Sequence, residues 1–447
     1  MKAYRAHIIS LGCPKNTVDA EAAISLLRRS GCTITSDPRA ADILLVNSCS
    51  FLDAAWRETL EETERLFHLK RSNGNKKLIL MGCLPVHRYN NLEQSLPWVD
   101  HIIPSGAHAL LPQLIEEWRS SSSKATTCPV DGIYDPFAAY ESRDLLTPAH
   151  TAYVKVAEGC DRSCSFCAIP VIRGPLSCRR PESILREIEG LLRKGVKEIT
   201  LIAQDILSYC SSGMKFPDLV TEIVETGVEW IRIFYLHPAT LTLETVGRLF
   251  ERDSVCRYLE VPFQHVSDEL LHKMKRSHSR VALEALLSGI HREFPDAVIR
   301  SEAIVGFPGE TESDFEKLKD FVASGWFASL GIFQFSSEPG TEAARLGDHV
   351  PKETVEERTA ELSAVQEAAS FDFHSRFIGK VLRVLVDRAV SNDEGVFDEC
   401  DFAGRFYGQA YETDGEVYLK GKNLIPGDFV MARILDAGIY DLMGEVV

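Results

Sequence analysis

Hydrophobic and polar positions alternate with two different periods along the first part of the chain. Three short apolar runs have the spacing of β-strands: Ala3–Ser10, Asp42–Asn47 and Lys76–Met81. Two segments between them have helical spacing: Thr17–Arg29 and Asp53–Leu69. Strands that alternate with helices form a parallel sheet with helices on its faces. We therefore predict an α/β domain over residues 1–125, followed by a linker without clear periodicity over residues 126–148.

A second alternating series begins at Tyr153 and extends over residues 149–374. Its six predicted strands are Tyr153–Ala157, Glu198–Ala203, Trp230–Leu236, Tyr258–Phe263, Val298–Val305 and Ser329–Phe335. Helical runs lie between them, for example Pro181–Lys194 and Ser313–Ser324. Six strand-plus-helix units fit an incomplete (βα)6 barrel of the TIM type better than they fit an open sheet. One long helix, Lys352–Ser370, is expected to end this domain.

The pattern changes again near Phe377, where Gly and Asp separate short apolar runs. Four strands are predicted there: Lys380–Asp387, Phe406–Tyr411, Glu416–Lys420 and Asp428–Leu435. Short strands with closely spaced turns are typical of a small closed β-barrel. We therefore predict a third domain, a small β-barrel, over residues 375–447.

Composition limits where this chain works and what it binds. The 447 residues contain no apolar run of about 18 residues, so we expect no membrane span. The N-terminal apolar stretch is too short for a secretory signal, which predicts a cytoplasmic protein. Its 12 cysteines then suggest metal ligation or catalysis, because the cytoplasm keeps thiols reduced. A formal charge of −16 argues against broad binding to nucleic acid and permits a basic protein partner.

The sharpest chemical signal is a group of three cysteines directly after the first barrel strand. Cys160, Cys164 and Cys167 lie within eight residues, so their thiolates can bind one face of an iron–sulfur cluster. A zinc site is the alternative, but structural zinc needs four ligands, and no fourth Cys or His follows at suitable spacing. Three ligands leave one iron open, where the amino and carboxylate groups of S-adenosylmethionine (SAM) can bind.

Three other cysteines each follow one of the first three predicted strands: Cys13, Cys49 and Cys83. Functional groups of parallel α/β sheets gather at the carboxyl ends of the strands, so these thiols are expected to converge. The alternative is three buried, inert cysteines, a common environment for this residue. If the thiols converge, they predict a second cluster whose open iron can bind sulfur. The remaining cysteines, among them Cys128 and Cys178, are expected to be structural.

Several residues near barrel strand ends are candidates for binding SAM. Gln204 and Asp205 close the second strand, where barrel active-site residues normally lie. Gly306, Gly309 and Glu310 follow the fifth strand, and glycines there would let the backbone approach a ligand. Arg173 and Arg179 follow the cysteine loop and could neutralise a carboxylate. His237 and His265 are expected to pack rather than to act.

These motifs, in this order, resemble the methylthiotransferase family of radical SAM enzymes over the whole chain. The family has a three-cysteine N-terminal domain, a radical SAM domain and a C-terminal TRAM β-barrel. The motif Ser10-Leu-Gly-Cys13-Pro-Lys-Asn16 resembles the ribosomal-protein branch of this family more than the tRNA branch, as do two further segments. Those segments are Tyr258-Leu-Glu-Val-Pro-Phe-Gln-His265 and Tyr440-Asp-Leu-Met-Gly-Glu445.

The resemblance implies a specific activity and a set of cofactors. Such enzymes carry two [4Fe-4S] clusters and use SAM to methylthiolate the β-carbon of an aspartate in ribosomal protein S-twelve. The cluster on Cys160, Cys164 and Cys167 would cleave SAM, and the cluster on the other three cysteines would deliver sulfur. The N-terminal domain is expected to be flavodoxin-like.

The resemblance and the charge also predict partners. We expect the S-twelve protein or the small ribosomal subunit as substrate, an electron donor such as flavodoxin or ferredoxin, and a sulfur donor for a monomeric enzyme. Residues 375–447 carry eight basic and thirteen acidic side chains, which suits a basic protein better than tRNA. Two other functions stay open: tRNA adenosine methylthiotransfer, which needs the same cysteines, and a non-catalytic iron–sulfur carrier.

Overall fold

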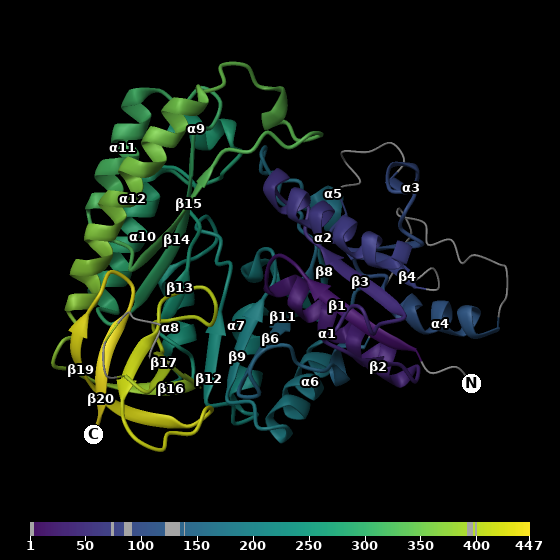
Figure 1. Ribbon diagram of the computed structural model, residues 1–447. Coiled ribbons are helices and arrows are strands. Elements are labelled where there is room, and N and C mark those ends of the chain that lie inside the picture. The colour runs from purple at the N-terminus through teal and green to yellow at the C-terminus, as the bar shows by residue number, and fades with distance from the viewer. Residues whose placement is uncertain are drawn as a thin grey trace.

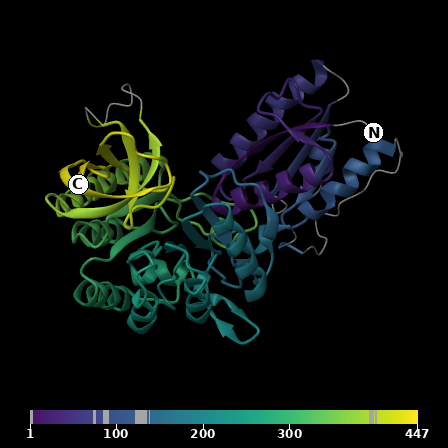
Figure 2. The same ribbon diagram turned by 90° about the horizontal axis from the view of Figure 1, so that it is seen from below.

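The computed structural model describes residues 4–72, 76–84, 92–120, 135–137, 139–390, 397 and 400–447. Figure 1 shows three regions that follow one another along the chain: an N-terminal domain in purple and blue, a central domain in teal and green, and a C-terminal barrel in yellow. Figure 2 shows the N-terminal domain and the C-terminal barrel on separate sides of the central domain. Part of the predicted linker, residues 126–134 and 138, lies outside the described residues, as do residues 121–125 before it, and the exact domain limits stay a prediction.

The N-terminal domain is a parallel five-stranded sheet with the strand order β2-β1-β3-β4-β5. Its strands are β1 (Arg5–Ser10), β2 (Thr33–Ile34), β3 (Ile43–Ser48), β4 (Lys77–Gly82) and β5 (His101–Pro104). Its helices are α1 (Pro14–Arg29), α2 (Asp53–Ser72), α3 (Leu92–Ser95) and α4 (Leu111–Ser120). This strand order is that of flavodoxin-like folds, which confirms the predicted fold class. The hydrophobic pattern did not indicate β2, β5, α3 or α4; the first three of these have only two to four residues.

In the N-terminal sheet, side chains along each strand point alternately to the two faces, and this explains why helices pack on both faces. In β3, Leu45 packs in one apolar core with residues of α1 and α4, whereas Leu44 packs in another core with residues of α2. Neighbouring strand residues point to opposite faces, so two successive leucines serve both layers. The sheet is therefore buried on both faces and presents only its strand ends to the rest of the protein.

The central domain contains the six predicted strands in parallel order. They are β6 (Thr151–Lys155), β9 (Glu198–Ile202), β12 (Trp230–Ile233), β13 (Tyr258–Glu260), β14 (Val298–Val305) and β15 (Ser329–Gln334). They form two three-stranded sheets, β12-β9-β6 and β13-β14-β15, which adjoin where the Leu236 amide donates to the Glu260 carbonyl over 2.9 Å. The predicted incomplete barrel is confirmed.

Helices and short hairpins complete this domain. The helices are α5 (Ile169–Arg173), α6 (Pro181–Arg193), α7 (Phe216–Val224), α8 (Leu243–Phe250), α9 (Asp268–Lys273), α10 (Arg280–Glu293), α11 (Glu312–Ala323) and α12 (Lys352–Ser375). The hairpins pair β7 (Ala157–Glu158) with β8 (Ser177–Cys178) and β10 (Cys210–Ser211) with β11 (Met214–Lys215). Among the described residues, the helices are all too short or too polar to cross a membrane.

The C-terminal domain is a closed barrel with the strand order β16-β17-β18-β20-β19. Its strands are β16 (Val381–Ala389), β17 (Phe402–Phe406), β18 (Val417–Lys420), β19 (Phe429–Ala437) and β20 (Leu442–Val446). The strand predicted at Phe406–Tyr411 is wrong, because β17 ends at Phe406 and the following residues form a loop. That loop packs on the central domain, where Arg232 donates to the Tyr407 carbonyl over 2.7 Å. Its apolar residues therefore serve a domain contact rather than a strand.

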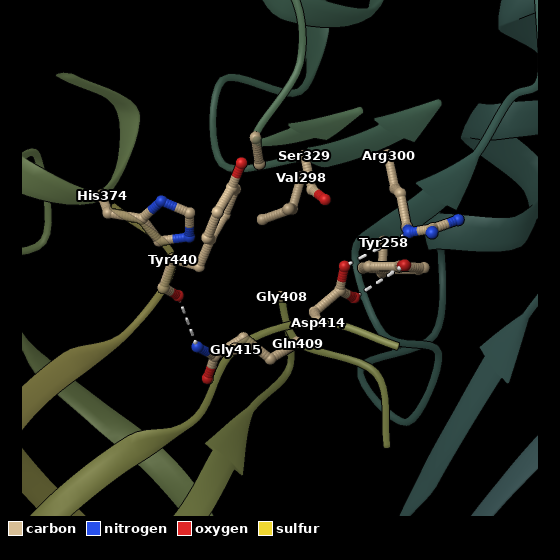
Figure 3. A pocket seen from close by; sticks show the side chains of 11 residues that line it. Tyr258, Val298, Arg300, Ser329, His374, Gly408, Gln409, Asp414, Gly415 and Tyr440 are labelled. Atoms are coloured by element: carbon tan, nitrogen blue, oxygen red, sulfur yellow. Dashed lines mark hydrogen bonds and ion pairs between the residues drawn. The ribbon is translucent and has the colours of Figure 1, made fainter. Parts of the chain in front are cut away.

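The C-terminal barrel covers the amino ends of the strands of the central domain. Tyr258, at the start of β13, donates its hydroxyl to Asp414 over 2.8 Å, and Arg300 lies 3.4 Å from the other oxygen of that carboxylate. Figure 3 shows these two side chains pointing at Asp414 from the opposite domain. The space left between the domains here is about 10 Å³, enough for at most a single water molecule.

Candidate active site

The first cysteine group lies on the loop that follows β6 and the short strand β7. The Cys160 amide donates to the Gly174 carbonyl over 3.1 Å, and the Ser165 amide donates to the Met274 carbonyl over 3.0 Å. Gly159 has a φ of 74°, and a Cβ there would overlap the Pro175 carbonyl. A glycine is therefore required directly before Cys160, and the loop is fixed at the carboxyl end of the first barrel strand.

The second cysteine group follows three adjacent strands of the N-terminal sheet. Cys13 follows β1, Cys49 follows β3 and Cys83 follows β4, and these strands are neighbours in the order β1-β3-β4. Asn16 connects the loops, because its amide group donates to the Leu11 and Ser48 carbonyls over 2.7 Å each and accepts from the Cys83 thiol over 3.4 Å. The sheet order thus brings together thiols that are far apart in the sequence.

Both cysteine groups face one cavity of about 380 Å³ between the N-terminal domain and the incomplete barrel of the central domain. Six thiols line this cavity: Cys13, Cys49, Cys83, Cys160, Cys164 and Cys167. Its volume falls within the range of pockets that hold small molecules and cofactors. On the barrel side, residues from the carboxyl ends of the strands line the cavity, which is where barrel enzymes place their active sites.

Burial and nearby charges set the protonation of these thiols. Burial raises the pKa of Cys83 and of Cys167 to about 12, and it raises the pKa of Cys49 and Cys160. Burial also acts to raise the pKa of Cys13, but Lys15, Arg173 and two backbone N–H groups outweigh it, so this pKa lies below its ordinary value. Without a bound metal most of these thiols are therefore protonated, and metal binding would release protons.

A buried ionic network joins the two domains beside the second cysteine group. Arg173, at the end of α5, donates to Glu158 over 2.7 Å and to the Cys83 sulfur over 3.2 Å, and it lies 3.3 Å from Asp19 of α1. Lys155 donates to the same two carboxylates over 2.6 Å each. Because one arginine contacts residues of both domains, a change in their docking would disturb both walls of the cavity.

Gln204 and Asp205, predicted to bind SAM, line the cavity next to the first cysteine group. Gln204 donates to Glu158 over 3.0 Å, and Asp205 accepts from Arg162 over 2.7 Å. Each keeps one buried oxygen, Gln204 Oε1 and Asp205 Oδ1, without a hydrogen-bond partner. Arg276 has an unpartnered Nε, while its Nη1 lies 3.7 Å from the Cys164 sulfur.

Arg173, another candidate, also lines the cavity, whereas the remaining predicted SAM contacts do not. Arg179 is buried within the central domain, where it pairs with Glu187 and donates to the Ser183 carbonyl over 3.0 Å. Its guanidinium therefore supports α6 rather than a ligand.

The loop after β14 is also structural in this arrangement. Glu310 accepts from Arg358 over 2.7 Å and from the Gly306 amide over 2.9 Å, so its carboxylate is used inside the loop. A Cβ on Gly306 would overlap Val355 of α12, which means that this glycine permits helix packing instead of close approach to a ligand. Gly309 has a φ of 82° and takes part in the same turn. Ile304, the penultimate residue of β14, lines the cavity in their place.

Several lining residues were not predicted, and two of them have an unusual backbone. Tyr235 and Gln264, just after β12 and β13, have φ values of 65° and 71°, a left-handed conformation that is uncommon for residues other than glycine. Such strain clusters at functional sites. His237, expected to pack, also lines the cavity. In the sequence these residues could be recognised only by their position after a strand, and many residues that do not line the cavity share that position.

The zinc alternative finds no support in this arrangement. Among the described residues, no three Cys, His, Asp or Glu side chains lie close enough together to hold one metal ion. The thiols of neither group therefore close around a single ion, as a structural zinc site would require. In a cubane cluster each thiolate binds a different iron, so such a convergence is not needed.

Three family models match the chain in the same order as the three domains. They are "Uncharacterized protein family UPF0004" over residues 5–104, the radical SAM superfamily over residues 154–322 and the TRAM domain over residues 378–447. Among solved structures, the radical SAM methyltransferase TsrM from Kitasatospora setae aligns with TM-scores of 0.54 and 0.57 in two complexes. Those alignments cover 76% and 82% of this chain and 74% and 89% of TsrM, at 14% and 12% identity, which supports the fold alone. The fold and the cysteine loop define a radical SAM protein.

Curated relatives narrow this class. The proteins named "Ribosomal protein uS12 methylthiotransferase RimO" from Geobacter sulfurreducens and Thermotoga maritima are 38% and 39% identical. Each alignment covers 99% of this chain, and they cover 98% and 100% of the relatives. The relative of the same name from Myxococcus xanthus is 36% identical over 99% of this chain and 91% of its own length. The chain belongs to the uS12 methylthiotransferase family.

Proposed function

We propose that this chain is a radical SAM methylthiotransferase that modifies the β-carbon of an aspartate in ribosomal protein uS12. The observation that carries the proposal is the shared cavity, in which six thiols from two domains face one space of about 380 Å³. Methylthio transfer must break a C–H bond and then place sulfur on the same carbon. Two thiol groups that face one cavity meet this requirement without a large movement of the substrate.

Each cysteine group is suited to one [4Fe-4S] cluster with an iron that no protein residue binds. With clusters and SAM bound, the site would supply a 5′-deoxyadenosyl radical, sulfur and a methyl group, which protein side chains do not provide. Arginines adjoin a thiol in each group, since Arg173 lies 3.2 Å from the Cys83 sulfur and Arg276 lies 3.7 Å from the Cys164 sulfur. Nearby cations favour the thiolate form that binds metal.

The polar groups beside the first cysteine group suit SAM. Buried polar atoms are nearly always hydrogen-bonded, so unpartnered atoms on a cavity wall indicate a polar ligand. Gln204 Oε1 and Asp205 Oδ1 offer acceptors for the amino and hydroxyl groups of SAM, and Arg276 Nε offers a donor for its carboxylate. Arg162 holds Asp205 in place through their 2.7 Å contact, so the acceptor does not need to reorient when a ligand binds.

Apolar side chains around the same cavity would protect a reactive radical. Phe333 and Phe335 line it from the end of the sixth barrel strand, and Phe51 lines it from the N-terminal domain. Excluding water prevents side reactions of unstable intermediates. The cavity therefore combines polar groups that hold a cosubstrate with apolar walls around the reacting atoms.

The charge of the C-terminal domain supports a protein substrate. Its excess of acidic residues complements a basic ribosomal protein and disfavours an RNA backbone. Part of this charge is internal, because Asp387 pairs with Arg405 and Asp414 lies against Arg300. The same proposal includes reduction by flavodoxin or ferredoxin, an external sulfur donor, and action as a monomer in the cytoplasm.

Mass spectrometry of a mixed reaction tests this function. The reconstituted protein is incubated without oxygen with SAM, reductant, sulfide, uS12 and unmodified tRNA in one tube. We expect a methylthio mass gain on one aspartate of uS12 and none on tRNA. A gain on a tRNA adenosine alone would refute the assigned substrate but keep the chemistry, whereas SAM that stays intact would support a non-catalytic carrier.

A further inference from the structure

Four cationic side chains line the cavity, and three of them are held by local partners. Arg162 pairs with Asp205 over 2.7 Å, and Arg173 pairs with Glu158 over 2.7 Å. Arg276 donates to the Pro262 carbonyl over 2.5 Å and lies against the Cys164 sulfur. The fourth cation is Lys15, which makes no ion pair with a carboxylate in the described part of the chain, although Glu158 and Glu260 act on it from a greater distance.

Lys15 occupies an electrostatically unfavourable position. It is only 6% exposed and lies in the first turn of α1, where the described helix has no acidic residue. A cation at a helix N-terminus opposes the helix dipole, and a buried charge needs a partner. Cys13, Glu158 and Glu260 are negative groups that act on Lys15, but neither carboxylate pairs with it directly, so its position on the cavity wall also suits an anionic ligand.

The ammonium group of Lys15 reaches from one cysteine group toward the other. Lys15 is two residues after Cys13, and its Nζ donates to the Ala203 carbonyl over 3.2 Å, directly before Gln204 and Asp205. The Nζ also lies 3.3 Å from the centre of the Tyr235 ring. An ammonium has three donors, and these contacts with an uncharged carbonyl and a ring leave capacity for an anion.

The strained backbone at Tyr235 supports this role. Its φ of 65° is held in part by the Glu260 carboxylate, which accepts from the Tyr235 amide over 3.2 Å. The left-handed conformation places the ring beneath the Lys15 ammonium, so the lysine is fixed by residues of the other domain. Strain of this kind persists where the surrounding structure imposes it, and it is concentrated at ligand sites.

We propose that Lys15 binds the side-chain carboxylate of the substrate aspartate and so determines which residue is modified. This inference rests on the proposed function and names the specificity residue of that same site. The carboxylate carbon of aspartate is bonded directly to the β-carbon, so an ion pair with Lys15 holds the reacting carbon between the two cysteine groups. Fixing a reacting atom in this way is a large part of how enzymes accelerate reactions.

Binding of two forms of uS12 tests the inference without relying on turnover. Affinity for the cluster-loaded protein is measured with uS12 and with uS12 in which the modified aspartate is changed to asparagine. We expect the wild-type protein to bind the aspartate form at least about 30-fold more tightly, as for a buried charge pair that loses one partner. Lys15→Met should remove this preference, and Lys15→Arg should keep most of it.

The controls separate this inference from other roles of Lys15. Iron content and the optical spectrum of Lys15→Met should match those of the wild-type protein, because Cys13 remains. Loss of the N-terminal cluster in that variant would overturn the inference in favour of a role beside Cys13. Equal binding of both uS12 forms by the wild-type protein would also overturn it, even if the variant failed to fold. If the wild-type protein does not modify uS12 at all, the proposed function itself fails.

Discussion

The six parallel strands of the central domain end in two different environments. At their carboxyl ends the N-terminal domain leaves a cavity of about 380 Å³ that six thiols line. At their amino ends the C-terminal barrel leaves about 10 Å³ beside Tyr258 and Asp414, and a more open groove of about 350 Å³ beside Lys197 and Glu229 that no cysteine lines. Both contacts contain buried ion pairs: Arg173 with Glu158 at the first, and Arg405 with Glu198 and Asp387 at the second. Buried charge alone therefore does not identify a functional site.

The six thiols distinguish the carboxyl ends, because buried polar atoms without a hydrogen-bond partner occur at both ends, for example Arg232 Nη2 and Asp205 Oδ1. At the amino ends Glu198 accepts from Arg232 over 2.9 Å, and Glu198 and Asp387 each pair with Arg405 over 2.7 Å, so two carboxylates balance two guanidinium groups. At the carboxyl ends Gln204 and Asp205 each keep an unpartnered oxygen beside the cavity, and Lys15 donates to a single carbonyl there. The comparison assigns chemistry to one end and domain attachment to the other, as in barrel enzymes generally.

The largest expected effect is at the carboxyl ends. Cys164→Ala should abolish formation of 5′-deoxyadenosine, because the first cluster would lose one of its three ligands. Chromatography of SAM reaction products measures this directly. Cys178→Ala is the matched control, since Cys178 is half-buried outside the cavity, and it should retain activity. If Cys164→Ala formed 5′-deoxyadenosine normally, SAM would not be cleaved at the carboxyl ends of the strands, and this part of the account would be wrong.

A substitution at the amino ends should instead affect stability. Arg405→Met leaves Glu198 and Asp387 buried without their shared partner, so it should lower the free energy of unfolding by about 3–5 kcal/mol. Chemical denaturation measures the loss. At a temperature where the variant is folded, its SAM cleavage should equal that of the wild-type protein. Loss of SAM cleavage by a folded Arg405→Met protein would contradict the division between the two ends.

Acid should weaken the attachment of the C-terminal barrel. Burial acts to raise the pKa of Asp387, but Arg405 and His150 outweigh it and hold this pKa below its ordinary value. A carboxyl with a lowered pKa stabilises the fold above its unfolded pKa and loses that contribution as the pH falls through its folded pKa. The difference in melting temperature between the wild-type protein and Asp387→Asn should therefore be largest near neutral pH and shrink below about pH 4. A constant difference would contradict the ionised pair.

The smallest expected effect is at an exposed pair of the same contact. Arg383 pairs with Glu229 across the domain boundary, but their side chains are 44% and 42% exposed. Arg383→Met should change the free energy of unfolding by less than about 1 kcal/mol, because solvent screens such a pair. Chemical denaturation of Arg383→Met and Arg405→Met under the same conditions compares the two losses of unfolding free energy. Equal losses would show that burial does not determine how much such an ion pair contributes.

The sequence indicated the six thiols, and the structure places all of them on one cavity. That prediction was possible because each cysteine lies at a strand end, and parallel sheets gather their strand ends at one edge. Arg179 and Glu310 form local ion pairs outside this cavity, which position near a strand end does not reveal, and their role as SAM contacts stays a prediction. The contact of Lys15 with Ala203 joins two domains over 188 residues, and no spacing in the sequence indicates it. The strand β20 was not predicted, although it pairs with β19, which ends only a short turn before it.

The central claim is that two clusters face one cavity at the carboxyl ends of the barrel. Mössbauer spectroscopy of protein reconstituted with isotopically enriched iron tests it most directly. Three proteins are compared. They are the wild type, a variant in which Cys13, Cys49 and Cys83 are all changed to alanine, and a variant in which Cys160, Cys164 and Cys167 are all changed to alanine. We predict two [4Fe-4S] clusters per chain in the wild type and one in each variant. A single cluster in the wild type, lost from only one variant, would contradict the account.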